Sequence, residues 1–271
     1  MFNYLNAKDR KIVKKFQKEC YIIFNLDKKD LKLKKIRNFV VSEIKKYFQK
    51  KKIKIKRFNE ENILNNFHKY IKKSELNKLR LRIYNELNSQ KWFIQNYFNL
   101  AKKELELLCG NELVMQRKVN FSVQLPGDDS SLLPVHSDVW SGCSPYELVL
   151  WIPLVNCKST KSMFILPNKH NSQIYKNFKK FKNSNELQKK IDKKIKWLKV
   201  NYGQGIIFAH QLIHGNKINR TKETRWSFNC RFKSLMSPYD EKDIAETFIP
   251  ILIRPATVSY THLTLPTKRI V

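Results

Sequence analysis

His136 and Asp138 are separated by one residue in the segment Leu-Pro-Val-His-Ser-Asp-Val-Trp-Ser-Gly at positions 133–142. On an extended segment, side chains two positions apart point to the same side, so this imidazole and this carboxylate can hold one metal ion. A third ligand is needed, and His214 is the best-placed candidate. Two histidines and one carboxylate form a facial triad, which leaves positions open for a co-substrate and dioxygen on non-haem Fe(II).

A strand with one polar and one apolar face is predicted after His214. Positions 225–232 alternate, with the polar set Arg225, Ser227, Asn229 and Arg231 and the apolar set Trp226, Phe228, Cys230 and Phe232. A buried guanidinium needs an anionic partner, because burying an unpaired charge is costly. The planar fork of Arg225 suits a carboxylate, and the Ser227 hydroxyl can donate to the same oxygens. A dicarboxylate co-substrate would satisfy both side chains.

A shifted assignment of the third ligand uses His210, which lies four residues before His214 and ten before Arg220. We favour His214 as the third ligand because the carboxylate-binding pair Arg225 and Ser227 follows it on the predicted strand. In the alternative, the arginine that follows His210 is Arg220, and it is succeeded by Thr and Lys in a loop. His210 is then expected to line the pocket or to support the ligands.

The motifs His136-Ser-Asp138, His214 and Arg225-Trp-Ser227 together resemble the His-x-Asp, distal His and Arg-x-Ser pattern of Fe(II)/2-oxoglutarate-dependent dioxygenases. The resemblance is to the phytanoyl-CoA hydroxylase-like branch in particular. Segments 135–142, 150–154 and 224–231 are similar to oxygenases encoded in bacterial surface-carbohydrate gene clusters. The resemblance covers residues 112–257.

This resemblance implies an α+β fold built on a double-stranded β-helix, the jelly roll of cupin-like proteins. It implies that Fe(II) is bound by His136, Asp138 and His214, and that 2-oxoglutarate is held by Arg225 and Ser227. The implied activity is that of an oxidoreductase that hydroxylates a carbohydrate or carbohydrate precursor with dioxygen and releases succinate and carbon dioxide. Asp138 favours hydroxylation, because related halogenases lack this carboxylate.

Further candidate contacts lie on the predicted polar strand faces. Gln124, on a strand predicted at 118–125, is expected near the metal-binding end of 2-oxoglutarate. The candidate substrate contacts are Lys118, Trp140, Asn229 and Arg231, which suit an anionic small molecule such as a nucleotide sugar.

Three regions differ in their sequence pattern. Residues 1–110 are basic and predicted to form a helical layer on the core, since apolar residues recur at steps of three and four and no glycine precedes Gly110. Residues 111–257 are predicted to be the jelly-roll core, with strands at 118–125, 147–155, 162–167, 203–210 and 225–232 and a helical insertion at 175–199. Residues 258–271 lack the Lys, Asn and Ile-rich composition of the preceding chain, which suggests a non-native tail.

The formal net charge of the 271-residue chain is +31. Basic and acidic residues are nearly balanced between positions 112 and 167, so the charge avoids the candidate site and no specific nucleic-acid partner is predicted. The five scattered cysteines fit a reducing cytoplasm, and no transmembrane segment is predicted. Two alternatives to the oxygenase stay open, a basic jelly-roll binding module for an anionic polymer and a metal-dependent sugar epimerase.

Overall fold

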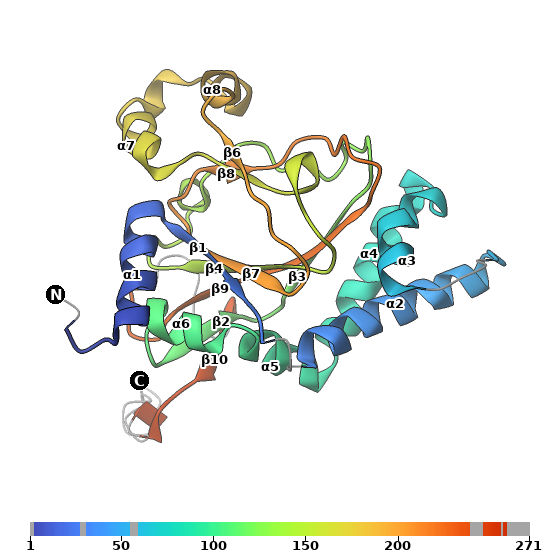
Figure 1. The fold of residues 1–271 in the computed structure, drawn as a ribbon, viewed down its shortest axis with the longest axis horizontal. Coiled ribbons are helices and arrows are strands. Elements are labelled where there is room, and N and C mark those ends of the chain that lie inside the picture. The colour runs from blue at the N-terminus through green and yellow to red at the C-terminus, as the bar shows by residue number, and fades with distance from the viewer. Residues whose placement is uncertain (1–2, 28–30, 55–58, 239–245, 256, 259–271) are drawn as a thin grey trace, which may run out of the picture.

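The computed structural model describes residues 3–27, 31–54, 59–238, 246–255 and 257–258 (Figure 1). Its helices are α1 Ala7–Glu19, α2 Lys32–Lys50, α3 Glu60–Asn66, α4 Lys73–Asn88, α5 Lys91–Asn99, α6 Lys102–Cys109, α7 Asn168–Lys176 and α8 Ser184–Ile191. Its strands are β1 Tyr21–Asn25, β2 Leu113–Gln116, β3 Asn120–Gln124, β4 Leu148–Pro153, β5 Phe164–Ile165, β6 Lys196–Trp197, β7 Gln204–Ala209, β8 His214–Gly215, β9 Arg225–Ser234 and β10 Phe248–Leu252.

Two antiparallel sheets form the core. The larger has the order β1-β7-β4-β9-β2-β10, with β3 also paired to β9, and the smaller has the order β6-β5-β8. Figure 1 shows the small sheet lying above the large one, with helices packed on the outside. The prediction of an α+β double-stranded β-helix with an N-terminal helical layer and a helical insertion is confirmed.

Five strands were not predicted: β1, β2, β6, β8 and β10. β1 lies within the region predicted to be helical and pairs with β7, with Tyr21 opposite Phe208. Its short apolar run cannot be distinguished from a buried helical segment by periodicity. β10 pairs with β2 beyond the last predicted strand. The large sheet therefore takes an edge strand from each end of the described chain.

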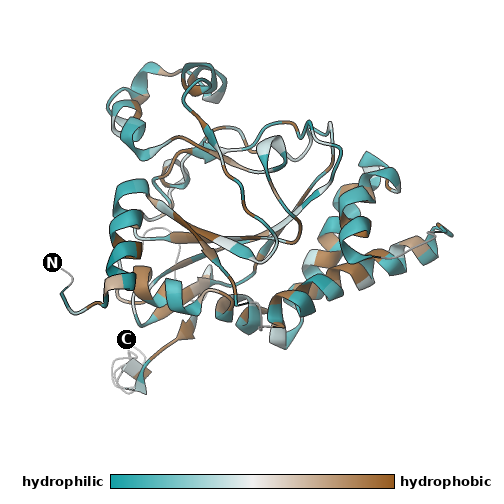
Figure 2. Cartoon of the chain, in the orientation of Figure 1, coloured by the Kyte–Doolittle hydropathy of each residue, from teal (hydrophilic) through white to brown (hydrophobic). Residues whose placement is uncertain are grey.

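The helical layer packs on the large sheet through aromatic side chains. Phe67, fully buried after α3, lies 5.1 Å from Trp226 of β9 between ring centroids, and it also contacts Tyr47 and Phe48 of α2. The indole Nε1 of Trp226 donates a hydrogen bond to Leu64 O at 2.8 Å. In Figure 2 these helices carry alternating hydrophilic and hydrophobic stripes, as amphipathic helices on a core do.

Strand β9 divides the core from the interior cavity. Its aromatic face contacts the helices, with Phe228 5.5 Å from Phe93 and Phe232 6.2 Å from Phe98. The alternation of a strand therefore turns Arg225, Ser227, Asn229 and Arg231 away from the helices. On the neighbouring strand β3, Ser122 is opposite Ser227 and Gln124 is opposite Arg225.

The insertion consists of α7, the 3-10 turn Phe178–Lys180 and α8, and it lies across the molecule from α2–α4 in Figure 1. The helical insertion predicted at 175–199 begins earlier, because α7 starts at Asn168, and its end is strand β6 rather than a helix. Residues 259–271 of the suggested non-native tail lie outside the described residues. Within the described part of the chain, no helix is both long and apolar enough to cross a membrane.

We expect Phe67→Ala to lower the free energy of unfolding by about 3–5 kcal/mol, because it leaves a cavity where the helical layer meets β9. Denaturant unfolding followed by circular dichroism measures this change. Leu81→Ala is the control, since Leu81 of α4 is 41% exposed and its truncation should cost less than about 0.5 kcal/mol. Equal effects of the two substitutions would contradict the packing described here.

Candidate metal centre and co-substrate pocket

The segments that carry His136 and His214 are joined by two backbone hydrogen bonds. His136 N donates to His214 O and His214 N donates to His136 O, each at 2.9 Å. Gly215 fits here only without a side chain, because an added Cβ would lie 2.8 Å from Phe164 Cζ. The close packing fixes β8 against β5 and holds the two histidine backbones side by side.

His136, Asp138 and His214 present ligand atoms that lie within 4.8 Å of one another. Each imidazole Nδ1 faces a backbone carbonyl, Pro134 O at 2.7 Å for His136 and Leu212 O at 2.8 Å for His214. Since a carbonyl only accepts, each Nδ1 carries the proton and each Nε2 keeps its lone pair. The Nε2 atom of His214 is 3.9 Å from Asp138 Oδ2. The local backbone thus sets both rings in a metal-binding tautomer.

Asp138 reaches the same side as His136 because Ser137 between them is extended, with φ −125° and ψ 136°. Asp138 then begins a 3-10 turn, Asp138–Ser141. Arg231 Nη2 donates to Asp138 Oδ1 at 3.0 Å, while Oδ2 faces His214. Burial raises the pKa of Asp138, but His214, His210 and Arg231 outweigh it and hold the pKa below its ordinary value. The carboxylate is therefore ionised at neutral pH.

His214 is uncharged at neutral pH. Burial and the neighbouring His136 lower the pKa of His214 to about 4. A neutral imidazole beside an ionised carboxylate is the protonation state that binds a divalent metal ion.

A cavity of about 370 Å³ lies beside the three candidate ligands. Its lining residues are Arg80, Asn120, Ser122, Leu133, His136, Asp138, Val149, Trp151, Met163, Phe208, His214, Gly215, Asn216, Arg225, Asn229 and Arg231. The lining includes side chains of β3, β4 and β9 and the segments that carry the two histidines. The cavity therefore joins the candidate metal ligands to the polar face of β9.

Arg225 and Ser227 have unsatisfied buried atoms on this face. Arg225 is 4% exposed, and its Nη2 donates to Ser122 Oγ at 3.3 Å, but its Nε has no hydrogen-bond partner. The Ser227 hydroxyl is fully buried and also without a partner. Burial lowers the pKa of Arg225, which reflects the cost of a charge in this place. A carboxylate ligand would satisfy both groups and neutralise the guanidinium.

Some of the other predicted contact residues line the cavity and others lie outside it. Asn229 and Arg231 line the cavity. Gln124 is buried outside the cavity lining, and its amide donates to Lys217 O at 2.8 Å. Lys118 is exposed near the Tyr84 ring, and Trp140 packs against the insertion, 4.4 Å from Phe178 between ring centroids. Four predicted contacts are thus absent from the cavity lining: Lys118, Trp140, Gln124 and Ser227.

Three residues line the cavity without having been predicted as site residues: Arg80, Asn120 and Ser122. Asn120 and Ser122 were on the polar face of the predicted strand, and that alternation was a usable signal. Arg80 comes from α4, where Nη1 donates to Phe121 O at 3.2 Å and Nη2 to Asn77 Oδ1 at 2.8 Å. Nothing in its local sequence separates Arg80 from the other basic residues of the helical layer.

His210 belongs to a second, fully buried group with Cys143 and Glu147, whose potential ligand atoms also lie within 4.8 Å of one another. His210 Nδ1 is 3.5 Å from Glu147 Oε2. The His210 carbonyl accepts a hydrogen bond from Ser137 Oγ at 2.8 Å, beside Asp138. The geometry therefore groups His214, rather than His210, with His136 and Asp138.

Comparison with known proteins gives matches in structure only, since no family model and no curated protein matches the sequence. The nickel complex of the non-heme monooxygenase ThoJ is similar, with a TM-score of 0.53 and 13% identity over 90% of this chain and 84% of that chain. Apo ThoJ has a TM-score of 0.51 and 11% identity over the same shares. EvdMO1 has a TM-score of 0.52 and 11% identity over 85% of this chain and 51% of its own. The chain shares their fold.

We expect the wild-type protein to bind one Co(II) ion and Asp138→Ala to bind it on the order of 100-fold more weakly, because one of three protein ligands is lost. Isothermal titration calorimetry measures the affinity and the stoichiometry. Cys143→Ser is the matched control from the second buried group and should leave one ion bound. If Cys143→Ser lost the ion and Asp138→Ala kept it, the metal site would be the group of Cys143, Glu147 and His210 instead.

Proposed function

We propose that this protein is an Fe(II)/2-oxoglutarate-dependent oxygenase that hydroxylates a carbohydrate or a carbohydrate precursor. The observation that carries the proposal is one cavity lined by a His-Asp-His group and by the buried Arg225, whose Nε has no hydrogen-bond partner. The unpaired Ser227 hydroxyl is buried two residues further along the same strand. The fold shared with the non-heme monooxygenase ThoJ is consistent with this activity.

The donor set of the candidate centre fits Fe(II). His136 and His214 would bind it through Nε2 and Asp138 through Oδ2, a 2-His-1-carboxylate set with positions left open. Arg231 keeps the other Asp138 oxygen, Oδ1, in a hydrogen bond and so orients the carboxylate. The presence of this carboxylate favours hydroxylation over halogenation.

Arg225 and Ser227 would hold the distal carboxylate of 2-oxoglutarate. When bound, iron with 2-oxoglutarate and dioxygen supplies the oxidation of a C–H bond to an alcohol, with release of succinate and carbon dioxide. The chain contributes position and charge: Arg225 neutralises the distal carboxylate, Ser227 donates to it, and the buried strand face excludes water from both contacts. This leaves the keto-acid end free to face the metal ligands.

The remaining cavity wall suits a polar substrate with many hydroxyl groups. Asn120 Nδ2 donates to Asn229 Oδ1 at 3.0 Å, which leaves further amide donors and acceptors for a ligand. Arg80 and Trp151 also line the cavity. Amide, guanidinium and aromatic groups together can orient a sugar ring, and the cationic groups favour an anionic precursor such as a nucleotide sugar.

We expect anaerobic addition of Fe(II) and 2-oxoglutarate to give the weak visible charge-transfer band of a metal-bound keto acid, and His136→Ala to lack it because a ligand is missing. Anaerobic absorption spectroscopy measures the band. His68→Gln is the control, since His68 lies beside Thr224 outside the cavity and its replacement should keep the band. Iron-loaded wild-type protein without the band would exclude the oxygenase and leave the binding module or the epimerase.

We expect Arg225→Met to raise the 2-oxoglutarate concentration needed for half-saturation by about 10–100-fold, since it removes charge-assisted hydrogen bonds to a carboxylate. Titration of the charge-transfer band gives the 2-oxoglutarate affinity, and calorimetry with Fe(II) alone should give an unchanged metal affinity. Arg220→Met, on an exposed loop, is the matched control and should change neither value. An unchanged 2-oxoglutarate affinity in Arg225→Met would remove the role assigned to Arg225.

A further inference from the structure

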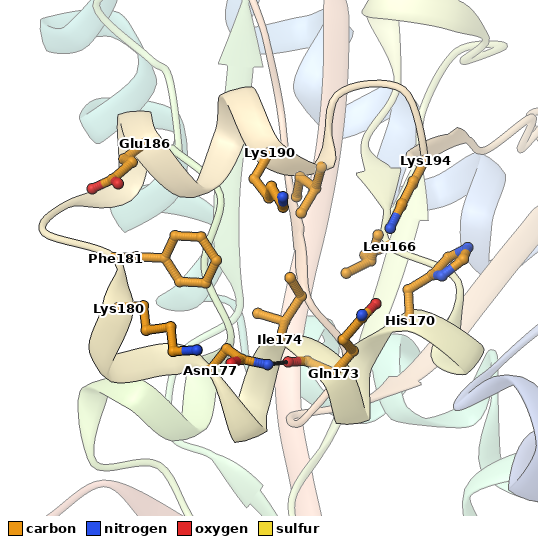
Figure 3. Close-up of a pocket in the computed structure, with 11 residues that line it drawn as sticks. Leu166, His170, Gln173, Ile174, Asn177, Lys180, Phe181, Glu186, Lys190 and Lys194 are labelled. Atoms are coloured by element: carbon orange, nitrogen blue, oxygen red, sulfur yellow. Dashed lines mark hydrogen bonds between the residues drawn. The ribbon is translucent and has the colours of Figure 1, made fainter.

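A second cavity, of about 470 Å³, lies within the helical insertion between α7, the turn Phe178–Lys180 and α8 (Figure 3). Four apolar side chains contribute to its wall: Leu166, Ile174, Phe181 and Ile191. Among the described residues, it shares no lining residue with the cavity beside the metal ligands. It is therefore a separate place where a ligand can bind.

Three lysines surround this apolar wall. Lys180 comes from the turn, Lys190 from α8 and Lys194 from the segment that follows α8. In Figure 3 the side chains of Lys190 and Lys194 reach toward the cavity, whereas the Glu186 carboxylate at its rim is turned away. Ammonium groups at the wall of an apolar cavity make the electrostatic potential there positive, so an anion that binds beside them is stabilised.

The acidic residues of the insertion are already engaged elsewhere. Glu186 accepts a hydrogen bond from Lys182 N at 2.9 Å, as part of the start of α8. Asp192 pairs with Lys217 at 2.8 Å. In the described part of the chain, no carboxylate lies within ion-pairing distance of Lys180, Lys190 or Lys194. The positive charge of the cavity is therefore not neutralised by the protein.

His170 of α7 lines the same cavity, close enough to Lys194 for its charge to act on the imidazole. Burial, together with Lys194 and Lys169, lowers the pKa of His170. An anion bound among the lysines would oppose the effect of Lys194 and raise this pKa again. The pKa of His170 can therefore be used to detect a charged ligand in this cavity.

We propose that this cavity binds a small molecule in which a phosphate group is joined to an apolar group. Phosphate carries about −1.5 to −2 charges at neutral pH and three acceptor oxygens, which match three lysines better than a single carboxylate does. The volume lies within the range of small-molecule sites and leaves room for an apolar portion against Ile174 and Phe181. The proposal does not depend on the function assigned to the metal cavity.

The probe is hexyl phosphate, titrated into the full-length protein and followed by calorimetry and by the NMR signal of the His170 ring. We expect saturable 1:1 binding and a raised His170 pKa, with the His68 signal unchanged. Hexyl phosphate should bind more than about tenfold more tightly than ethyl phosphate or inorganic phosphate, because added methylenes are buried on the apolar wall. Hexanoate and hexanol should bind more weakly than hexyl phosphate, because they carry less charge.

The variant Lys190→Gln with Lys194→Gln should weaken hexyl phosphate binding by roughly tenfold or more, since two charge-assisted contacts are lost. Lys189→Gln with Lys193→Gln is the matched control, because these exposed neighbours remove the same charge without lining the cavity. Equal loss in both variants, or hexanol binding as tightly as hexyl phosphate, would overturn the proposal. Binding only to vesicles of anionic lipid, and not to monomeric hexyl phosphate, would overturn it in favour of a membrane contact.

Discussion

The pair of backbone hydrogen bonds between His136 and His214 is the constraint on which the candidate metal centre depends. It holds two segments that are distant in sequence at a fixed separation. Each imidazole is then oriented by a hydrogen bond to the backbone carbonyl two residues before it. Folding therefore orders the two backbones and sets the tautomers of the two imidazoles before a metal ion binds. Pairing of β8 with β5, where Ile165 is opposite His214, holds the second of these segments in the small sheet.

Packing on one face of strand β9 offsets the unfavourable burial of a charge on its other face. Arg225 and Ser227 leave polar atoms without partners in the interior, and such atoms are unfavourable for the free protein. The opposite face of the same strand packs Trp226 and Phe228 into the helical layer. The helices therefore stabilise the strand from behind, and the cavity can retain groups whose partner is a ligand rather than the protein.

The sequence pattern predicted those parts of the site that depend on strand alternation. The two faces of β9 follow from period two, and the spacing of His136 and Asp138 needs only an extended Ser137. The remainder depends on tertiary packing. Trp140 lies in a 3-10 turn that carries it toward the insertion, and Arg80 reaches the cavity because α4 crosses β3. Neither position follows from a local pattern, because helix placement is decided by packing.

The two cavities differ in how they present positive charge, and this difference argues for different ligands. In the cavity beside the candidate metal ligands, Arg225 is buried and held by the strand. Its planar guanidinium can therefore select a carboxylate that is held in one orientation. In the insertion, exposed lysines on flexible stems surround an apolar wall, which suits a compact anion with less demand on orientation. The cavities are also linked through the backbone, because Leu166 N donates to Ile213 O at 2.8 Å, one residue before His214. A ligand that moved Leu166 would therefore act on the segment that carries a candidate metal ligand.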